Sequence, residues 1–133
     1  MQVRAYTKNI RITPRKLRLV ADSVREMPIE KALLTLPLIK KRASGIVLKT
    51  LKSAISNATN NSKLDRNTLF IKSLEVKESA FLKRMMEGAR GRVRPYKKRT
   101  SHLEIVLDQK IEKAEVIEPK AKKIEKEVKE IKK

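Results

Sequence analysis

Hydrophobic and polar residues alternate at the start of the chain, over residues 3–12. Val3 and Ala5 fall on one face, while Arg4, Tyr6 and Lys8 fall on the other. A period of two is typical of a strand, so we expect a short strand with one buried face and one basic face that meets solvent or a partner.

The spacing changes to a helical period after residue 12 and predicts three helices. The first begins at Pro14 with Thr13 as its N-cap, and Pro28 opens a second, shorter one. Pro37 is expected to end the second helix because it disfavours helical backbone at Leu36. The third runs over about residues 40–60. The apolar stripes of the three are Leu17, Val20, Ala21 and Val24; Ile29, Ala32, Leu33 and Leu36; and Ala43, Val47, Leu48, Leu51, Ala54, Ile55 and Ala58.

Two further strands are expected, over residues 69–77 and 103–107. The alternation in the first is interrupted, because Leu69 and Ile71 share one parity and Leu74 and Val76 the other. A β-bulge or burial of both faces would each explain this. The segment between the strands, about residues 79–102, is expected to form a long hairpin with its turn near Gly88 and Gly91.

These elements predict an α+β fold in which three helices pack on a small antiparallel sheet with a long protruding basic β-hairpin. Residues 1–110 form the globular domain that includes the hairpin. Residues 111–133 differ in composition, with nearly balanced charges and few apolar residues. We expect a charged tail there that is disordered or transiently helical.

Charge narrows the classes of function. The net charge of +19 and the pI near 10.4 favour a polyanionic partner, either nucleic acid or an anionic membrane surface. The absence of cysteine excludes disulfides and thiol chemistry, and no apolar run is long enough for a membrane span. The N-terminus has no apolar signal core, so the protein is expected in the cytoplasm.

The hairpin carries much of this charge. Residues 82–102 contain eight Lys or Arg residues and a single acid, Glu87. On the returning arm one parity, and therefore one predicted strand face, holds Arg90, Arg92, Arg94, Tyr96 and Lys98. An isolated two-stranded ribbon is marginally stable in water, so an external polyanion is the expected counter-charge, most plainly a nucleic-acid backbone.

Candidate catalytic chemistry is sparse. A single histidine without cysteine cannot build a His- or Cys-rich metal site, and the glycines of the hairpin lack the strand–loop–helix order of a phosphate loop. Ser101 and His102 are adjacent, but neighbours in a strand point to opposite faces and make a poor nucleophile–base pair. We expect no enzyme activity, metal, cofactor or small-molecule substrate.

Four sequence blocks carry a family resemblance: Ile12-Thr13-Pro14-Arg15-Lys16-Leu17-Arg18-Leu19-Val20-Ala21, Leu51-Lys52-Ser53-Ala54-Ile55-Ser56-Asn57-Ala58, Gly91-Arg92 and Lys98-Arg99-Thr100-Ser101-His102. In this order and spacing, residues 1–110 resemble bacterial large-subunit ribosomal protein 22. The resemblance implies a structural constituent of the large ribosomal subunit that binds 23S rRNA during early assembly. It also implies a hairpin that lines the nascent-peptide exit tunnel.

The same resemblance implies roles for individual residues and further partners. Neighbouring large-subunit proteins and the nascent polypeptide are the implied partners besides rRNA. The hairpin tip that lines the tunnel would be Met86, Glu87, Gly88, Ala89, Arg90 and Gly91. The rRNA-binding residues would be Arg15, Lys16, Arg18, Lys83, Arg84, Arg90, Arg92, Arg94, Lys97, Lys98, Arg99, Thr100, Ser101 and His102.

Two other classes remain open on the residues alone. A DNA-architectural protein with a basic β-ribbon arm would use Met85 and Met86 as an apolar wedge at the arm tip. A membrane-surface protein would use the thin apolar stripe of the tail, which consists of Val116, Ile117, Ile124, Val128 and Ile131.

Overall fold

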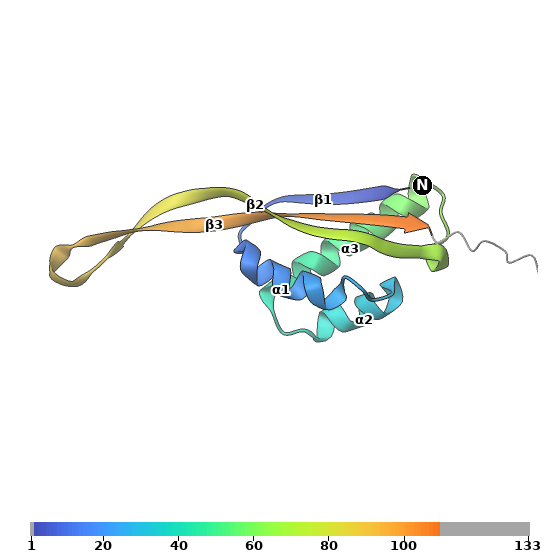
Figure 1. Ribbon diagram of the computed structural model, residues 1–133, viewed down its shortest axis with the longest axis horizontal. Helices are drawn as coiled ribbons and strands as arrows, with labels where there is room; N and C mark the ends of the chain where they lie inside the picture. The colour runs from blue at the N-terminus through green and yellow to red at the C-terminus, as the bar shows by residue number, and fades with distance from the viewer. Residues whose placement is uncertain (1, 110–133) are drawn as a thin grey trace, which may run out of the picture.

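The computed structural model describes residues 2–109, so the predicted tail lies outside the described residues. The elements follow the order β1 (Val3–Ile10), α1 (Pro14–Val24), α2 (Ile29–Leu38), α3 (Arg42–Asn60), a 3₁₀ turn (Arg66–Thr68), β2 (Leu69–Glu87), a second 3₁₀ turn (Ala89–Gly91) and β3 (Val93–Gln109). The molecule is elongated because β2 and β3 continue well beyond the helices (Figure 1). The predicted α+β class with a protruding hairpin is confirmed.

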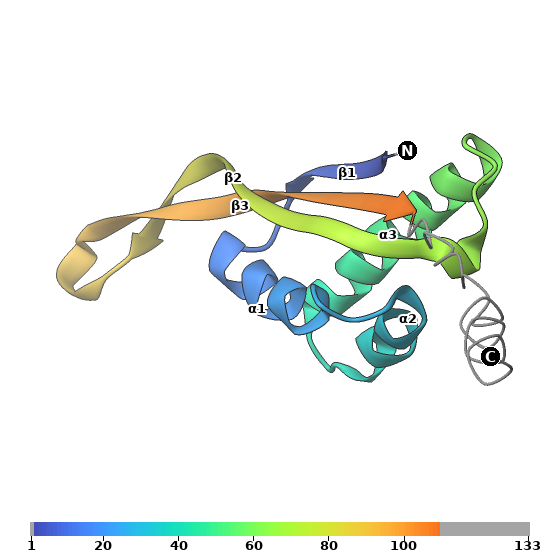
Figure 2. The same ribbon diagram turned by 45° about the vertical axis from the view of Figure 1, so that its right-hand side comes forward.

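The sheet has three antiparallel strands in the order β1–β3–β2. All three helices lie on one of its faces, as Figures 1 and 2 show from two directions. Helix α3 packs against β1 and β3, α1 packs against β2 and β3, and α2 packs on α3. Within residues 2–109 no helix covers the opposite face of the sheet, so this part of the chain forms two layers.

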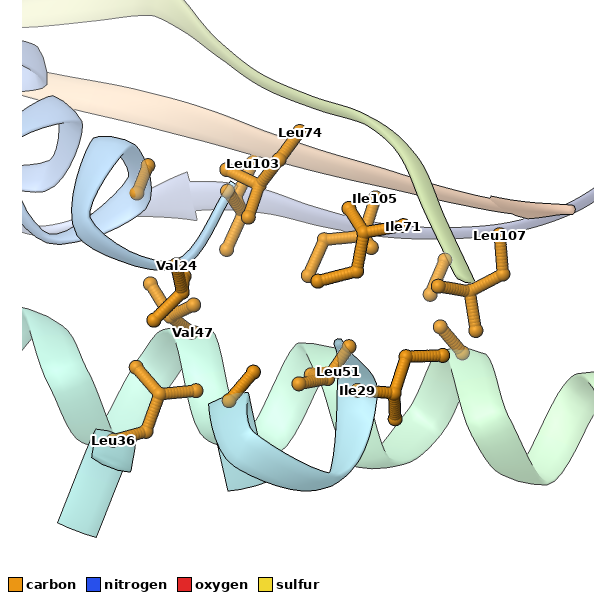
Figure 3. Close-up of a cluster of buried hydrophobic side chains, with 14 of the residues drawn as sticks. Val24, Ile29, Leu36, Val47, Leu51, Ile71, Leu74, Leu103, Ile105 and Leu107 are labelled. Atoms are coloured by element: carbon orange, nitrogen blue, oxygen red, sulfur yellow. The ribbon is translucent and has the colours of Figure 1, made fainter. Parts of the chain in front are cut away.

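Aliphatic side chains from both layers form the core (Figure 3). Strand β3 contributes its alternate residues Leu103, Ile105 and Leu107, none of which is exposed. Every residue of the three predicted helical stripes is buried or partly buried, including Leu33 and Leu48 at the margin. The apolar spacing in the sequence thus identified the faces that meet the sheet.

The interrupted alternation of the second predicted strand comes from a β-bulge. Ile71 pairs with Leu107 and Ser73 with Val106, so β2 has one extra residue, Lys72, at this point. The bulge brings Leu74 to the core side, where it is buried as Leu69 and Ile71 are. Of the two explanations offered by the sequence, the bulge is the one found.

Three predicted boundaries need correction. Helix α2 passes through Pro37 to Leu38, because a proline in the last turn removes only one hydrogen-bond donor and Leu36 is fully buried. Helix α3 begins at Arg42 rather than near residue 40, and β1 ends at Ile10 rather than residue 12. Thr13 occupies the N-cap position of α1, and its carbonyl accepts from Lys16 and Leu17, but its side chain makes no capping hydrogen bond.

Candidate nucleic-acid interface

The outer parts of β2 and β3 form an arm without a core. Pairing continues from Leu82 opposite Lys98 to Glu87 opposite Val93, and the side chains along this stretch are exposed. Opposed residues share a face of the ribbon. One face therefore presents Leu82, Arg84, Met86, Arg94, Tyr96 and Lys98, and the other presents Lys83, Met85, Glu87, Val93, Pro95 and Lys97.

Cations lie on both faces of the arm, and Arg94, Tyr96 and Lys98 share one of them, as the sequence predicted. Strand β3 begins at Val93, so Arg90 and Arg92 belong to the turn and do not continue the row of Arg94, Tyr96 and Lys98. Lys97 lies over the ring of Phe81, with its Nζ 4.7 Å from the ring centroid. This contact holds one cation in place while leaving its charge accessible.

The turn of the hairpin lies where the glycines predicted it. The N–H of Gly88 donates to the carbonyl of Arg92 at 2.7 Å, and Arg90 and Gly91 have left-handed backbone with φ of 58° and 67°. A Cβ on Gly88 would lie 2.8 Å from the Arg92 oxygen, so only glycine fits there. Of the predicted tip residues, Met86 and Glu87 end β2, while Gly88, Ala89, Arg90 and Gly91 form the turn.

Two predicted contact residues at the base of the arm, Thr100 and Ser101, form hydrogen bonds within the protein. Ser101 is fully buried and donates to the carbonyl of Ile12 at 2.9 Å. Thr100 is also buried and donates to the carbonyl of Ala80. Ser101 therefore ties β3 to the residues before α1, and Thr100 ties β3 to β2 at the base of the arm. Both side chains are buried, whereas the predicted contact with RNA would need exposed side chains.

His102 lies on the uncovered face of the sheet. Its Nδ1 accepts from the backbone N–H of Asn9 at 3.1 Å, and its ring lies 5.6 Å from that of Tyr6. Because Ser101 points to the covered face and His102 to the other, the two do not form a nucleophile–base pair, as the sequence predicted.

The predicted cations of α1 do not act as one group. Lys16 faces a hollow at the base of the arm together with Lys97, Lys98 and Arg99. Arg18 instead donates to the carbonyl of Val76 in β2 at 3.3 Å. Arg15 is exposed on α1 and does not line this hollow.

We call this hollow the basal groove. It has a volume of about 630 Å³, and its lining consists of Arg11, Ile12, Thr13, Lys16, Leu19, Lys41, Arg42, Ala43, Lys97, Lys98 and Arg99. Sequence reasoning missed Arg11, Lys41 and Arg42. The run of three cations over residues 40–42 could have indicated Lys41 and Arg42, but these residues were assigned to the third predicted helix.

Acidic side chains on the sheet form ion pairs with nearby lysines. Lys77 contacts Glu104 at 3.0 Å and Glu75 at 3.1 Å, and the hydrogen bond that Lys77 donates to Glu104 is the main reason that the pKa of Lys77 is raised. Lys72 donates to Asp108 at 3.0 Å, which lowers the pKa of that carboxyl group. Within residues 2–109 only Arg99 among the groove cations has an ion pair, with Glu78 at 3.7 Å.

The described residues contain neither a candidate metal site nor a candidate membrane span. Over residues 2–109, no group of three or more His, Cys, Asp or Glu side chains could hold a metal ion. No helix in that part of the chain is long and apolar enough to span a membrane. An exposed arm and a groove, both rich in unpaired cations, define a small basic α+β protein suited to binding a polyanion.

Comparison with known proteins identifies the family within this class. The family model "Ribosomal protein L22p/L17e" matches residues 5–108, and the chain belongs to that family. Three relatives are each named "Large ribosomal subunit protein uL22". The protein of Mesoplasma florum is 47% identical over 80% of this chain and 96% of its own length. That of a Thermoanaerobacter species is 44% identical (83% and 99%), and that of Chloroflexus aggregans is 42% identical (83% and 97%).

Proposed function

We propose that the protein is a structural constituent of the large ribosomal subunit, without catalytic activity, that binds 23S rRNA. The arm is the observation that carries this proposal. Residues 82–98 hold seven cations and one acid, and their side chains are exposed on a ribbon that has no core of its own. Phosphates packed around the ribbon would supply both the counter-charge and the lateral support that it lacks.

The resemblance and the length of the arm support a finer proposal, that the hairpin lines the nascent-peptide exit tunnel. Residues 80–87 of β2 project from the body by roughly 25 Å at about 3.3 Å per residue. The tip residues 86–91 would then contact the nascent polypeptide, while the cations along the arm contact rRNA. Contacts of this kind neutralise phosphates and recognise the shape of folded RNA.

Further parts of the proposal concern assembly and place of action. The protein binds rRNA early, supports assembly of the subunit in the cytoplasm, and contacts neighbouring large-subunit proteins. Residues 1–110 act as the rRNA-binding unit, and residues 111–133 are a peripheral tail. Cells depleted of the protein are therefore expected to accumulate immature large-subunit particles.

Sedimentation in high salt tests the central proposal. Ribosomes are centrifuged through a sucrose gradient at high ionic strength, and the protein is quantified in each fraction by mass spectrometry. Salt weakens each phosphate contact, so loosely bound basic proteins are lost. Retention at one copy per large subunit is expected, and release to the top of the gradient would contradict the proposal. In that case a preference for duplex DNA would favour the DNA-architectural alternative, which the family comparisons do not support.

Cross-linking tests the position of the tip. The chain has no cysteine, so Met86→Cys provides a unique attachment point for a photoreactive reagent. Ribosomes with a stalled nascent chain are expected to form a cross-link between this position and the nascent chain. Leu34→Cys on α2, whose side chain is 73% exposed, is the matched control and is expected to give none. Equal cross-linking from both positions would contradict the tunnel placement.

A further inference from the structure

The basal groove joins three segments that are far apart in the sequence. Arg11 and Lys16 come from the start of α1 and the residues before it, Lys41 and Arg42 from the start of α3, and residues 97–99 from the arm. Seven of its eleven lining residues are Lys or Arg, and none is acidic. So many like charges around one groove repel one another. This repulsion indicates that an anion occupies the groove when the protein is bound to its polyanionic partner.

The two helices that begin at this groove strengthen its positive potential. The first turns of α1 and α3 contain no acidic residue, and no side chain caps either end. Cations at a helix N-terminus oppose the helix dipole and slightly destabilise the free protein. Lys16 and Arg42 lie in these first turns, so their charges become favourable only once an external anion is present.

The lining is not uniformly charged. Ile12 and Ala43, which are 9% and 4% exposed, contribute apolar lining, and Leu19, which also lines the groove, is 61% exposed. A double helix offers a protein its phosphates and groove edges, whereas an unpaired nucleotide also offers the flat apolar face of its base. A volume of 630 Å³ lies within the range of about 300–1,000 Å³ typical of pockets that hold organic ligands.

We propose that the basal groove binds an unpaired nucleotide of structured RNA. Its base packs against Leu19 and Ile12, and the adjoining phosphates contact Lys16, Lys41 and Arg42 on one side and Lys97 and Arg99 on the other. Since the groove spans the body and the arm, this nucleotide also fixes the direction in which the arm leaves the body. The inference rests on the proposed binding of rRNA and adds the site and the kind of nucleotide.

The phosphate contacts are tested by removing two charges in the groove. The full chain carrying Lys41→Gln and Arg42→Gln is compared with one carrying Lys31→Gln and Lys52→Gln, which are exposed lysines outside the groove. Affinity for large-subunit rRNA is measured at several salt concentrations. The variant with both groove substitutions is expected to have a slope of log affinity against log salt that is less steep by about 1.5, because each phosphate contact contributes about 0.7–0.9. The variant with both control substitutions is expected to keep the slope of the unmodified chain.

This design separates the inference from the function on which it rests. Unmodified chain that fails to bind large-subunit rRNA would overturn the proposed function. Tight binding of the unmodified chain, together with equal slopes for the groove pair and the control pair, would overturn only the groove. Thermal unfolding followed by circular dichroism checks that the variants fold as the unmodified chain does.

The base contact is tested at Leu19. Leu19→Ala is expected to weaken rRNA binding about fivefold at an unchanged salt slope, the low end of what losing a base contact costs. The matched control is Leu34→Ala on α2, where the leucine is 73% exposed against 61% for Leu19, and it is expected to have no effect. Equal affinities for the two variants would overturn the base contact.

A photoreactive residue substituted at Leu19 gives a second readout in the assembled large subunit. A cross-link to one unpaired nucleotide is expected. Cross-links to paired nucleotides only, or to protein only, would overturn the proposal.

Discussion

The two halves of the β2–β3 ladder share one backbone pattern and have opposite surroundings. In the inner half, from Leu69 opposite Gln109 to Ser79 opposite Thr100, β3 alternates between buried and partly exposed residues. In the outer half, from Leu82 opposite Lys98 to Glu87 opposite Val93, both faces are exposed. The helix layer covers only the inner half (Figure 2).

The inner half of the ladder contributes to the stability of the fold, and the outer half provides the surface for binding. Burial of apolar surface is the main favourable term in folding, and it is concentrated where the sheet meets the helices. The outer half adds backbone hydrogen bonds and like charges but little burial, so it contributes little to the stability of the body. Its cations instead remain available for a partner. The same two strands therefore serve as scaffold at one end and as ligand-binding surface at the other.

The largest effect is expected from removing the outer half. Replacing residues 83–97 with Asn-Gly joins Leu82 to Lys98, which are already paired, and takes away six cations and one acid. Affinity for large-subunit rRNA at physiological salt should fall about a thousandfold or more, as expected when several phosphate contacts are lost. Thermal unfolding should change little. A filter-binding titration and a melting curve check both halves of the prediction, and a large drop in melting temperature would contradict the separation.

The next effect compares one truncation in each half. Leu103→Ala removes a fully buried side chain and is expected to lower the free energy of unfolding by about 2–5 kcal/mol. Met85→Ala truncates a side chain that is 79% exposed on the arm, and its effect should stay within about 0.5 kcal/mol. Urea unfolding followed by circular dichroism measures both. Comparable losses for the two variants would show that the arm shares the stability of the body.

The smallest effect concerns acid sensitivity. Because the hydrogen bond from Lys72 lowers the pKa of Asp108 below its ordinary value of 3.8, ionised Asp108 stabilises the fold above that pH. This stabilisation is lost as the pH falls through the lowered pKa. Asp108→Asn should therefore be less stable than the unmodified chain at neutral pH and approach it below about pH 4.

Glu87→Gln is the control for this prediction. Glu87 lies at the end of the arm and has no ion pair among residues 2–109, so removing its charge should change the free energy of unfolding by no more than about 0.5 kcal/mol. Unfolding free energies are measured between pH 2.5 and pH 7. Curves for Asp108→Asn and the unmodified chain that stay parallel over this range would contradict the assigned role of Asp108.

Much of this arrangement was predictable from local pattern. The periods of two and about 3.6 identified each strand and helix and the residues they bury, because burial of one face leaves a regular trace in the sequence. Gly88 and Gly91 marked the turn, where the close approach of the Arg92 carbonyl requires glycine at residue 88 and a positive φ favours it at residue 91. The passage of α2 through Pro37 was not predictable locally. A residue before proline prefers extended backbone, but packing of Leu36 against the core outweighs this preference.

The sequence by itself determined the charge, the aliphatic core, the hairpin and, through its motifs, the family. Tertiary structure alone decided which basic residues meet. Arg11, residues 41–42 and residues 97–99 form one groove only because α1 and α3 pack on the same face of the sheet with their first turns toward the arm. It also decided that Ser101 and Thr100 are buried. Alternation tells which residues of a strand share a face, but only the packing of the helix layer determines which face is covered and how far along the strand the cover extends.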